Sequence, residues 1–131
     1  MPRRTLHSQT APAPIGPYSQ AVAVAPGDVV FLSGQTPIDP ATGQLVHGDV
    51  QAQTRRAMEN LKAVLAAGGL DFSSVVRCGV FLVDMADFPA MNEVYGSYFP
   101  GTPPARTTVQ VAGLPKGARV EIDCIAVQEA R

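Results

Sequence analysis

The stretch SVVRCGVFLVD, Ser74 to Asp84, is the most strongly strand-forming segment of the chain. Valine and phenylalanine are prominent in it, and both of its alternating sets of side chains are largely apolar. A strand that is apolar on both sides needs cover on both faces of its sheet. We therefore expect this segment to lie in a sheet with helices on one face and another subunit on the other.

Two amphipathic helices are predicted on either side of this strand along the chain. The first follows Asp49, a plausible N-cap, and ends at Gly68-Gly69, with apolar residues recurring at helical spacing between them. The second runs from about Asp87 to about Phe99. Its apolar stripe includes Asn92, which is therefore a polar residue on an apolar face.

The remaining strands complete an α+β fold. Ala21–Val24 and Val29–Gln35 are predicted to form a hairpin, and two more strands are expected at about Ala105–Ala112 and Arg119–Gln128. Right-handed crossovers between strands and helices would place both helices on one face of a mixed β-sheet. We expect a single domain over residues 1–131, in which residues 1–13 form a flexible tail or loop.

The composition fits a compact protein and excludes several classes of partner. Hydrophobic residues make up 46% and charged residues 16% of the 131 residues, and the formal net charge is −1. Without a basic excess, nucleic-acid binding is not expected. No segment suits a membrane span or a secretory signal, and Cys78 and Cys124 fall in strand-like runs typical of buried thiols. These features predict a cytoplasmic protein.

Arg106 is unusual because it is a charged residue near the start of a strand of threonines and valines. Alternation along residues 105–112 puts the threonine–valine set in the core, and Arg106 and Thr108 on the helix-free face. The same counting places Glu121 on that face. A cleft between subunits that contains an arginine and a glutamate suits a small molecule. An ion pair of Arg106 with Glu121 or Asp123 is the commoner arrangement and remains an alternative.

The sequence lacks the other common catalytic devices. His7 and His47 have no metal-ligand spacing to another histidine or cysteine. Ser33, in LSGQ, does not sit in a GxSxG elbow, and the glycine-rich stretches form neither a Walker nor a Rossmann motif. We therefore expect neither a metal nor a cofactor.

Several separated motifs resemble the RidA/YjgF family of imine deaminases. They occur in the family's order between about Pro14 and Val127: IGPYSQA, FLSGQTPIDPATG, QTRRAMENLKAVLAAGG, PARTTVQV and VEIDCIAV. The resemblance implies a chorismate mutase-like fold with two helices on one face of a mixed sheet. It also implies a homotrimer in which the subunits meet at the other face of the sheet, with the sites between subunits.

The resemblance further implies a 2-iminobutanoate/2-iminopropanoate deaminase, a hydrolase acting on C=N bonds. Such enzymes convert reactive 2-imino acids, in equilibrium with enamines such as 2-aminoacrylate, to 2-keto acids and ammonia without a cofactor. Arg106 matches the arginine that grips the substrate carboxylate, and Glu121 matches the glutamate that orients the attacking water. The positions that match the rest of the pocket are Tyr18, Ser33, Gly34, Asn92 and Thr108, the last in place of a cysteine that many members carry.

Two other functions stay open on the sequence. Relatives have been labelled translation-inhibiting endoribonucleases of the L-PSP type, although the near-neutral charge and the lack of a histidine pair argue against RNA cleavage. A non-catalytic trimer that binds carboxylates, or acts like a chaperone, would still use Arg106 to bind its ligand. Turnover of an imino acid separates these hypotheses.

Overall fold

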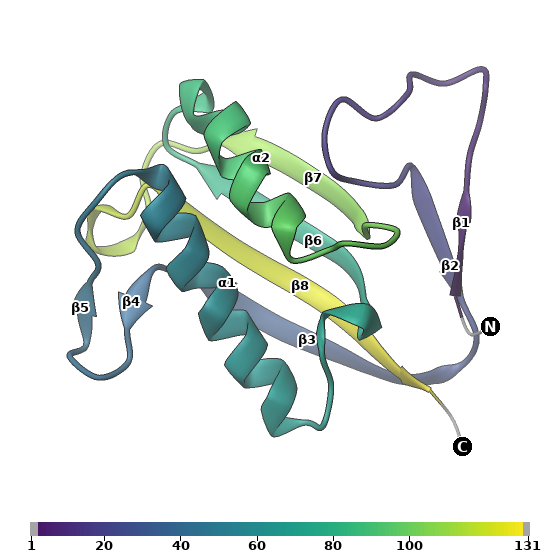
Figure 1. The fold of residues 1–131 in the computed structure, drawn as a ribbon, viewed down its shortest axis with the longest axis horizontal. Helices are drawn as coiled ribbons and strands as arrows, with labels where there is room; N and C mark the ends of the chain where they lie inside the picture. The colour runs from purple at the N-terminus through teal and green to yellow at the C-terminus, as the bar shows by residue number, and fades with distance from the viewer. Residues whose placement is uncertain (1–2, 130–131) are drawn as a thin grey trace.

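Four strands form the main sheet of the protein, which the computed structural model describes over residues 3–129. The strand β8 (Val120–Glu129) runs antiparallel to both of its neighbours, whereas β6 (Val75–Leu82) and β7 (Ala105–Gln110) are parallel, so the sheet is mixed as predicted. The stretch Ser74–Asp84 supplies β6, which is an interior strand (Figure 1). In spatial order the strands are β3 (Gly27–Gln35), β8 (Val120–Glu129), β6 (Val75–Leu82) and β7 (Ala105–Gln110).

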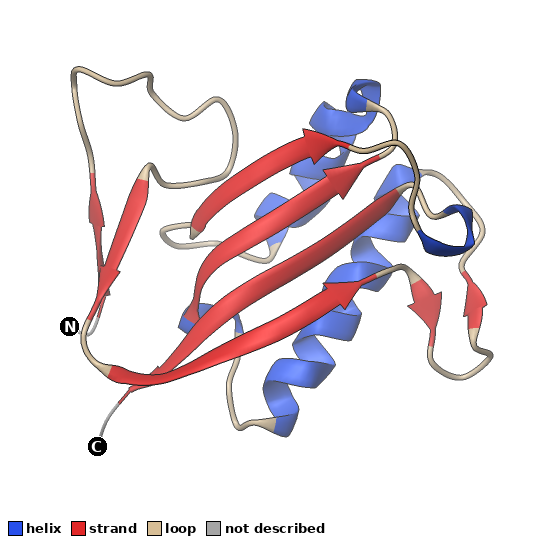
Figure 2. Ribbon diagram, turned by 180° about the vertical axis from the view of Figure 1, so that it is seen from behind, coloured by secondary structure: helices blue, strands red, loops and turns tan. Residues whose placement is uncertain are grey.

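Two helices, α1 (Val50–Ala67) and α2 (Phe88–Ser97), cover the same face of this sheet (Figure 1). Figure 2 views the opposite face, on which neither of these helices lies. The carboxylate of Asp49 caps α1 by accepting a hydrogen bond from the Ala52 N–H at 2.9 Å, and the C-cap of α1 is Gly68. These features confirm the predicted α+β arrangement. No helix in the described part of the chain is long and apolar enough to cross a membrane.

Smaller elements complete the fold. Two short antiparallel sheets pair β1 (Arg3–Leu6) with β2 (Ala21–Val24), and β4 (Ile38–Asp39) with β5 (Gln44–Leu45). Three 3₁₀ turns lie at η1 (Phe72–Ser74), η2 (Met85–Asp87) and η3 (Pro115–Gly117).

The N-terminal region differs from the sequence prediction in two respects. The predicted hairpin of β2 with β3 is wrong, because β2 pairs with β1 and β3 pairs with β8. Gly27 permits the close approach of β3 to β8, since a Cβ there would lie 2.2 Å from the carbonyl oxygen of Gln128. Residues 1–13 are not simply a tail or loop, because Arg3–Leu6 form β1. The Arg3 guanidinium donates to the carbonyls of Ser73 and Thr102, which are remote in sequence.

The hydrophobic core lies between the two helices and the sheet face that they cover. Cys78 on β6 and Cys124 on β8 lie opposite each other in the sheet. Both are free, buried thiols, as predicted. Their neighbours in the core are Val80, Leu82, Val120 and Ile122 of the sheet, Ala57, Met58, Leu61 and Leu65 of α1, and Met91 and Tyr95 of α2.

The helix-free face of the sheet exposes large apolar side chains. Val29 and Phe31 of β3 are 53% and 74% exposed, and Val109 of β7 is 41% exposed. On β6, Arg77 is exposed and Phe81 is half-buried, so this strand is fully covered on its helix side only. Cover of the helix-free face by another subunit stays a prediction.

Tyr98, just after α2, links the two helices, and the stability that its hydroxyl contributes is expected to be lost at high pH. Its hydroxyl donates to Glu59 Oε2 of α1 at 2.7 Å, and burial together with this bond raises the pKa of Tyr98 to about 12. Unfolded tyrosine releases its proton near pH 10, so the stability from this group is complete below about pH 10. It is lost as the pH rises towards the folded pKa of about 12.

We therefore expect Tyr98→Phe to lower the free energy of unfolding by about 1 kcal/mol at neutral pH. The difference between wild type and variant should shrink as the pH rises above about 10. Denaturant unfolding of both proteins across this pH range measures it. A difference that stays constant with pH would contradict the role given to this hydroxyl.

Candidate functional site

Arg106 lies on the helix-covered side of the sheet, in the edge strand β7. Its Cα partner on β6 is Cys78, which is fully buried beneath the helices, and residues paired across neighbouring strands share a face. Thr108 pairs with the buried Val80 and lies on the same side. The prediction that Arg106 and Thr108 face the helix-free side is therefore wrong.

The error came from choosing the core face of β7 by its apolar character. Thr107 and Val109 looked like the better core set, but both are exposed on the helix-free face. The inner face of β7 instead meets aromatic side chains of α2, which accommodate the guanidinium of Arg106. A threonine–valine strand therefore does not reveal from its own sequence which of its faces lies inward.

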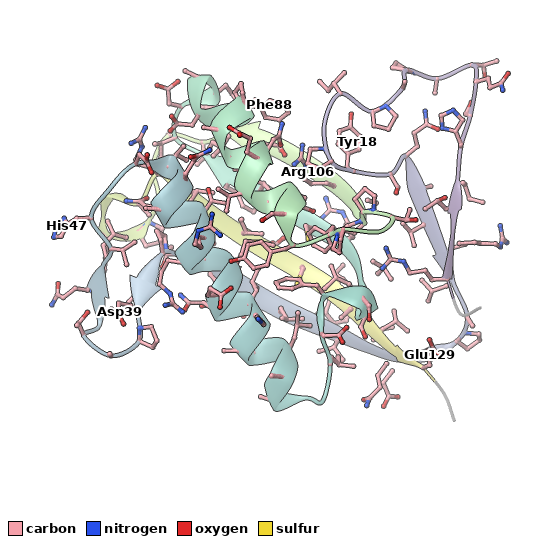
Figure 3. The ribbon with its side chains drawn as sticks, viewed as in Figure 1. Tyr18, Asp39, His47, Phe88, Arg106 and Glu129 are labelled. Atoms are coloured by element: carbon pink, nitrogen blue, oxygen red, sulfur yellow. The ribbon has the colours of Figure 1, made fainter. Side chains whose placement is uncertain are left out.

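Three aromatic rings surround the guanidinium of Arg106. Its Cζ lies 5.3 Å from the ring centroid of Tyr18, 5.5 Å from that of Phe88 and 5.0 Å from that of Tyr95. Figure 3 shows Arg106 between the loop that carries Tyr18 and the helix that carries Phe88. The faces of aromatic rings attract cations, so this cage holds the charge without neutralising it. Burial raises the pKa of Tyr95, so its phenol stays uncharged beside the cation.

One neutral hydrogen bond fixes the orientation of Arg106. Its Nη1 donates to Asn92 Oδ1 at 2.7 Å, which explains the polar residue on the apolar stripe of α2. Within residues 3–129 the ion pair found joins Arg119 to Asp87, so no described carboxylate compensates Arg106. Burial lowers the pKa of Arg106, but arginine keeps its charge in proteins. The result is a half-buried cation that can bind an anion.

The loop of residues 15–18 closes the site from the other side. The hydroxyl of Tyr18 accepts a hydrogen bond from the Ile15 N–H at 3.3 Å, and the Ser19 N–H donates to the Pro104 carbonyl at 3.0 Å. These contacts tie the loop to the chain just before β7. A Cβ on Gly16 would lie 3.0 Å from Arg106 Nη2, so glycine lets the loop backbone approach the guanidinium.

A cavity of about 520 Å³ opens beside Arg106, a size typical of small-molecule sites. Tyr18, Phe88 and Thr108 are among the residues that line it. The Thr108 hydroxyl is buried and has no hydrogen-bond partner in the described part of the chain. Such a group is costly unless a ligand or solvent satisfies it.

Sequence reasoning had left two aromatic residues of this site out. These residues are Phe88 and Tyr95, which lie on α2 beside Arg106. The available signal was their helical spacing from Asn92, at i−4 and i+3, which puts all three on one face. Residues on the same face as a site asparagine are therefore candidates for the same site.

Glu121 occupies the opposite face of the sheet. It pairs with Phe81, on the side of the sheet that no helix covers, so the prediction that it shares a face with Arg106 is wrong. Within one chain the alternative ion pairs of Arg106 with Glu121 or Asp123 do not form; the Asp123 carboxylate accepts from the Gly79 N–H instead. The structure therefore brings Arg106, Tyr18, Asn92 and Thr108 together and leaves Glu121 apart.

Ser33 and Gly34 lie with Glu121 rather than with Arg106. They occupy an irregularity between Leu32 and Gln35, where the register of β3 against β8 shifts. A Cβ on Gly34 would lie 2.1 Å from Glu121 Oε2, so glycine at this position lets the carboxylate lie against the backbone of β3. The site residues predicted from the sequence thus form two groups on opposite faces of one sheet.

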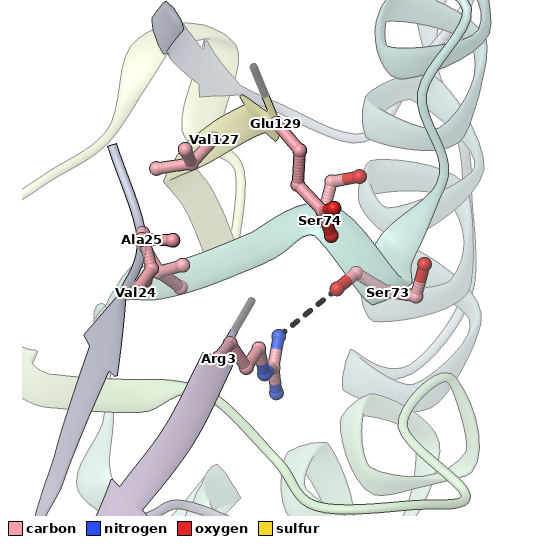
Figure 4. Close-up of a pocket in the computed structure, with 8 residues that line it drawn as sticks. Arg3, Val24, Ala25, Ser73, Ser74, Val127 and Glu129 are labelled. Atoms are coloured by element: carbon pink, nitrogen blue, oxygen red, sulfur yellow. Dashed lines mark hydrogen bonds between the residues drawn. The ribbon is translucent and has the colours of Figure 1, made fainter. Parts of the chain in front are cut away.

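A second, smaller cavity of about 70 Å³ lies near the N-terminus, between Arg3, Val24 and Glu129 (Figure 4). Arg3 donates to the carbonyls of Ser73, Val75 and Thr102, so its guanidinium is already occupied by backbone acceptors. These bonds fasten β1 to the body of the protein. This cavity therefore has a structural explanation, unlike the cavity beside Arg106.

Replacing Asn92 by aspartate tests whether the binding of carboxylates requires the uncompensated charge of Arg106. The substitution keeps the shape of the side chain but puts a carboxylate at the 2.7 Å contact with Arg106. We expect Asn92→Asp to weaken the binding of small carboxylates such as 2-oxobutanoate by about tenfold or more, and to keep the protein folded. Calorimetric titration and thermal unfolding measure the two effects.

The matched control is Asn92→Ser, which removes the acceptor without adding a charge. It should weaken binding less than Asn92→Asp does, because the guanidinium stays uncompensated. Equal losses in the two variants would show that geometry, and not charge, limits anion binding.

Comparisons with known proteins give matches over nearly the whole length of the chain. The family model described as "Endoribonuclease L-PSP" matches residues 8–128. The chain is 65% identical over 127 residues to "Protein DfrA" of Myxococcus xanthus. This match covers 97% of this chain and 97% of that protein. It is 50% identical over 126 residues to the "2-iminobutanoate/2-iminopropanoate deaminase" of Mus musculus, covering 96% of this chain and 92% of that protein.

A solved structure shows the same fold. A protein from Yersinia pestis, YyfA, described as a protein of unknown function of the conserved Rid protein family, superposes with a TM-score of 0.75 at 42% identity. The match covers 96% of this chain and 99% of that one. The matching motifs, the mixed sheet under two helices and these relatives together show that the chain belongs to the Rid (RidA/YjgF) family.

Proposed function

We propose that the protein hydrolyses 2-imino acids to 2-keto acids and ammonia, as a homotrimer with its sites between subunits. The observation that carries this proposal is the Arg106 guanidinium, held in an aromatic cage beside a cavity with no described carboxylate to neutralise it. A 2-imino acid supplies the missing anion through its carboxylate. The mouse relative named a deaminase of such acids supports the same choice.

The reaction requires little from the protein beyond binding the substrate and orienting it and the attacking water. The iminium carbon of the protonated substrate is electrophilic, and one water adds to it. Loss of ammonium then leaves the keto group, so that C=NH₂⁺ and H₂O become C=O and NH₄⁺. Arg106 fixes the carboxylate next to the reacting carbon through its planar fork, and the Thr108 hydroxyl donates to the same ligand. No covalent nucleophile is needed.

In this proposal Glu121 of a neighbouring subunit orients the attacking water. Within one chain Glu121 and Arg106 lie on opposite faces of the sheet, so one protomer cannot bring them to the same substrate. The exposed Val29, Phe31 and Val109 favour burial of the helix-free face against another copy. In the proposed trimer the group of Ser33, Gly34 and Glu121 from one subunit faces the Arg106 cavity of the next.

Mixing two inactive variants tests both the activity and the shared site. Arg106→Ala and Glu121→Gln should each lower kcat/KM for the imine of 2-aminobutanoate by on the order of a hundredfold. Unfolding the variants together and refolding them at equal amounts should restore about a quarter of wild-type activity, because a quarter of the interfaces then pair two intact residues. Ammonia release from enzymatically generated imine is the measurement.

Two outcomes would count against the proposal. If the mixture stays inactive while sizing shows mixed trimers, the two residues do not form one site across an interface. If neither single variant loses activity, Arg106 and Glu121 have no catalytic role. RNA degradation that survives stringent purification and is lost in Arg106→Ala would favour the endoribonuclease hypothesis instead.

A further inference from the structure

Two free thiols lie opposite each other in the core, beside the strand that carries Arg106. Cys78 of β6 and Cys124 of β8 are Cα partners, and both are buried on the helix side of the sheet, at 0% and 2% exposure. Arg106 of β7 is the Cα partner of Cys78 on its other side, since β6 lies between β7 and β8 (Figure 1). The cation and the two thiols therefore form one row across the sheet. The proposed deaminase mechanism uses neither thiol.

The backbone pattern of β6 brings these two thiols close together. The Leu82 carbonyl accepts from the Val111 N–H at 2.8 Å, so the backbone groups of Leu82 point towards the β7 side. Backbone groups alternate in direction along a strand, so those of Cys78, four residues earlier, point the same way, whereas the Gly79 N–H points towards β8. Cys78 and Cys124 are thus a non-hydrogen-bonded pair. The Cα atoms of such pairs are about 4.5 Å apart, within the range that a disulfide requires.

The surroundings favour Cys78 as the thiol that reacts first. Its hydrogen bond with Cys124 lowers the pKa of the Cys78 thiol from its ordinary value, and Tyr95 and Arg106 act in the same direction. The same hydrogen bond, together with burial, raises the pKa of Cys124. A thiolate, and not a thiol, is the form that attacks an oxidant. Cys78 is therefore the attacking group, and Cys124 is placed to resolve the product.

Tyr95 connects this pair of thiols to the anion site. Its ring centroid lies 5.0 Å from Arg106 Cζ, and its hydroxyl lies beside the Cys78 thiol. This buried hydroxyl has no hydrogen-bond partner among the nitrogen and oxygen atoms of the described chain. The sulfur atoms of a disulfide are only about 2.05 Å apart, so closing the bond draws Cys78 Sγ towards Cys124 and away from Tyr95. Since a buried hydroxyl without a polar neighbour is costly, the ring of Tyr95 then shifts.

We propose that hydrogen peroxide converts Cys78 and Cys124 to an internal disulfide, and that this bond shifts Tyr95 and weakens anion binding at Arg106. In the first step the Cys78 thiolate attacks a peroxide oxygen and the O–O bond breaks, which leaves a sulfenic acid and a hydroxide that takes up the proton of Cys78. The sulfur of Cys124 then attacks the sulfenic sulfur. The S–S bond forms, the S–O bond breaks, and the oxygen leaves as water with the proton of Cys124. Two electrons pass from the thiols to the peroxide, and two waters form in all.

The oxidation step does not depend on assembly or on deaminase activity. Both thiols are buried by their own chain, so the pair is complete within one protomer. Burial slows the reaction, but hydrogen peroxide is small and uncharged and reaches the pair when the structure opens locally. The effect on anions alone rests on the proposed function, because that function makes Arg106 the carboxylate site.

The first test counts thiols in the folded protein before and after treatment with hydrogen peroxide. Cys78 and Cys124 are the two cysteines of the chain. Loss of both thiols, a mass lower by two hydrogen atoms and a monomeric chain on a denaturing gel without reductant identify the internal bond, and dithiothreitol should restore both thiols. Retention of both thiols, added oxygen in place of the bond, or a bond between two chains would overturn the proposal.

The second test follows Tyr95 by NMR of protein labelled in its tyrosine rings. The chain has three tyrosines, so Tyr95→Phe assigns the signal of Tyr95. This signal should move on oxidation and return on reduction, whereas that of Tyr98, which is bonded to Glu59, should stay in place. In the same samples the affinity for 2-oxobutanoate should fall by about threefold or more, as measured by calorimetric titration. An unmoved Tyr95 signal, or an affinity that is unchanged or raised, would overturn the link to Arg106.

Cys78→Ala is the matched control for other effects of peroxide. Peroxide also oxidises methionine, and Met85 lines the cavity beside Arg106. Because Cys78→Ala cannot form the bond, peroxide should change neither its Tyr95 signal nor its affinity for 2-oxobutanoate. Equal losses of affinity in this variant and in wild type would overturn the role given to the thiols. The wild-type measurements decide the proposal even if the variant does not fold.

The failure of this proposal differs from the failure of the proposed function. If the reduced wild type binds no carboxylate, the proposed function is lost, and with it the effect on anions, while the thiol count and the Tyr95 signal still decide whether the disulfide forms and moves the ring. If imines are hydrolysed at the same rate before and after oxidation, the deaminase stands and the redox control does not.

Discussion

The arrangement of the site depends on one half-buried cation that the described chain does not neutralise. The Arg106 guanidinium is held by three aromatic rings and by the amide oxygen of Asn92, all of which stabilise the charge without cancelling it. An aspartate or glutamate in place of Asn92 would stabilise this arginine more strongly. A neutral acceptor keeps the cation available to an anionic ligand.

The scaffold explains why this cation stays in place. The parallel pairing of β7 with β6 sets Arg106 beside the buried Cys78, so it must lie under α2. The loop of residues 15–18 reaches the same point because Ser19 is bonded to the chain just before β7. Elements from three separate parts of the sequence therefore meet at one side chain, and each is fastened by backbone hydrogen bonds.

Much of this could be predicted from the sequence, and the exceptions have physical reasons. The helix periods, the Asp49 cap and the interior strand at Ser74–Asp84 are local patterns, and they were predicted correctly. The partner of β2 and the inward face of β7 depend on contacts with remote strands, which local pattern does not encode. Family motifs indicated Arg106, Tyr18 and Glu121 together, but strand pairing places Glu121 on the opposite face of the sheet from Arg106.

That separation links assembly to chemistry in the proposed enzyme. Side chains on opposite faces of a sheet cannot be brought together by rotamer changes, so Arg106 and Glu121 can share a substrate only if a second copy supplies one of them. The apolar side chains exposed on the same face of the sheet as Glu121, such as Phe31, gain from burial against that copy. The same contact that removes apolar surface from water would then complete the site, and an isolated protomer would bind carboxylates without hydrolysing imines.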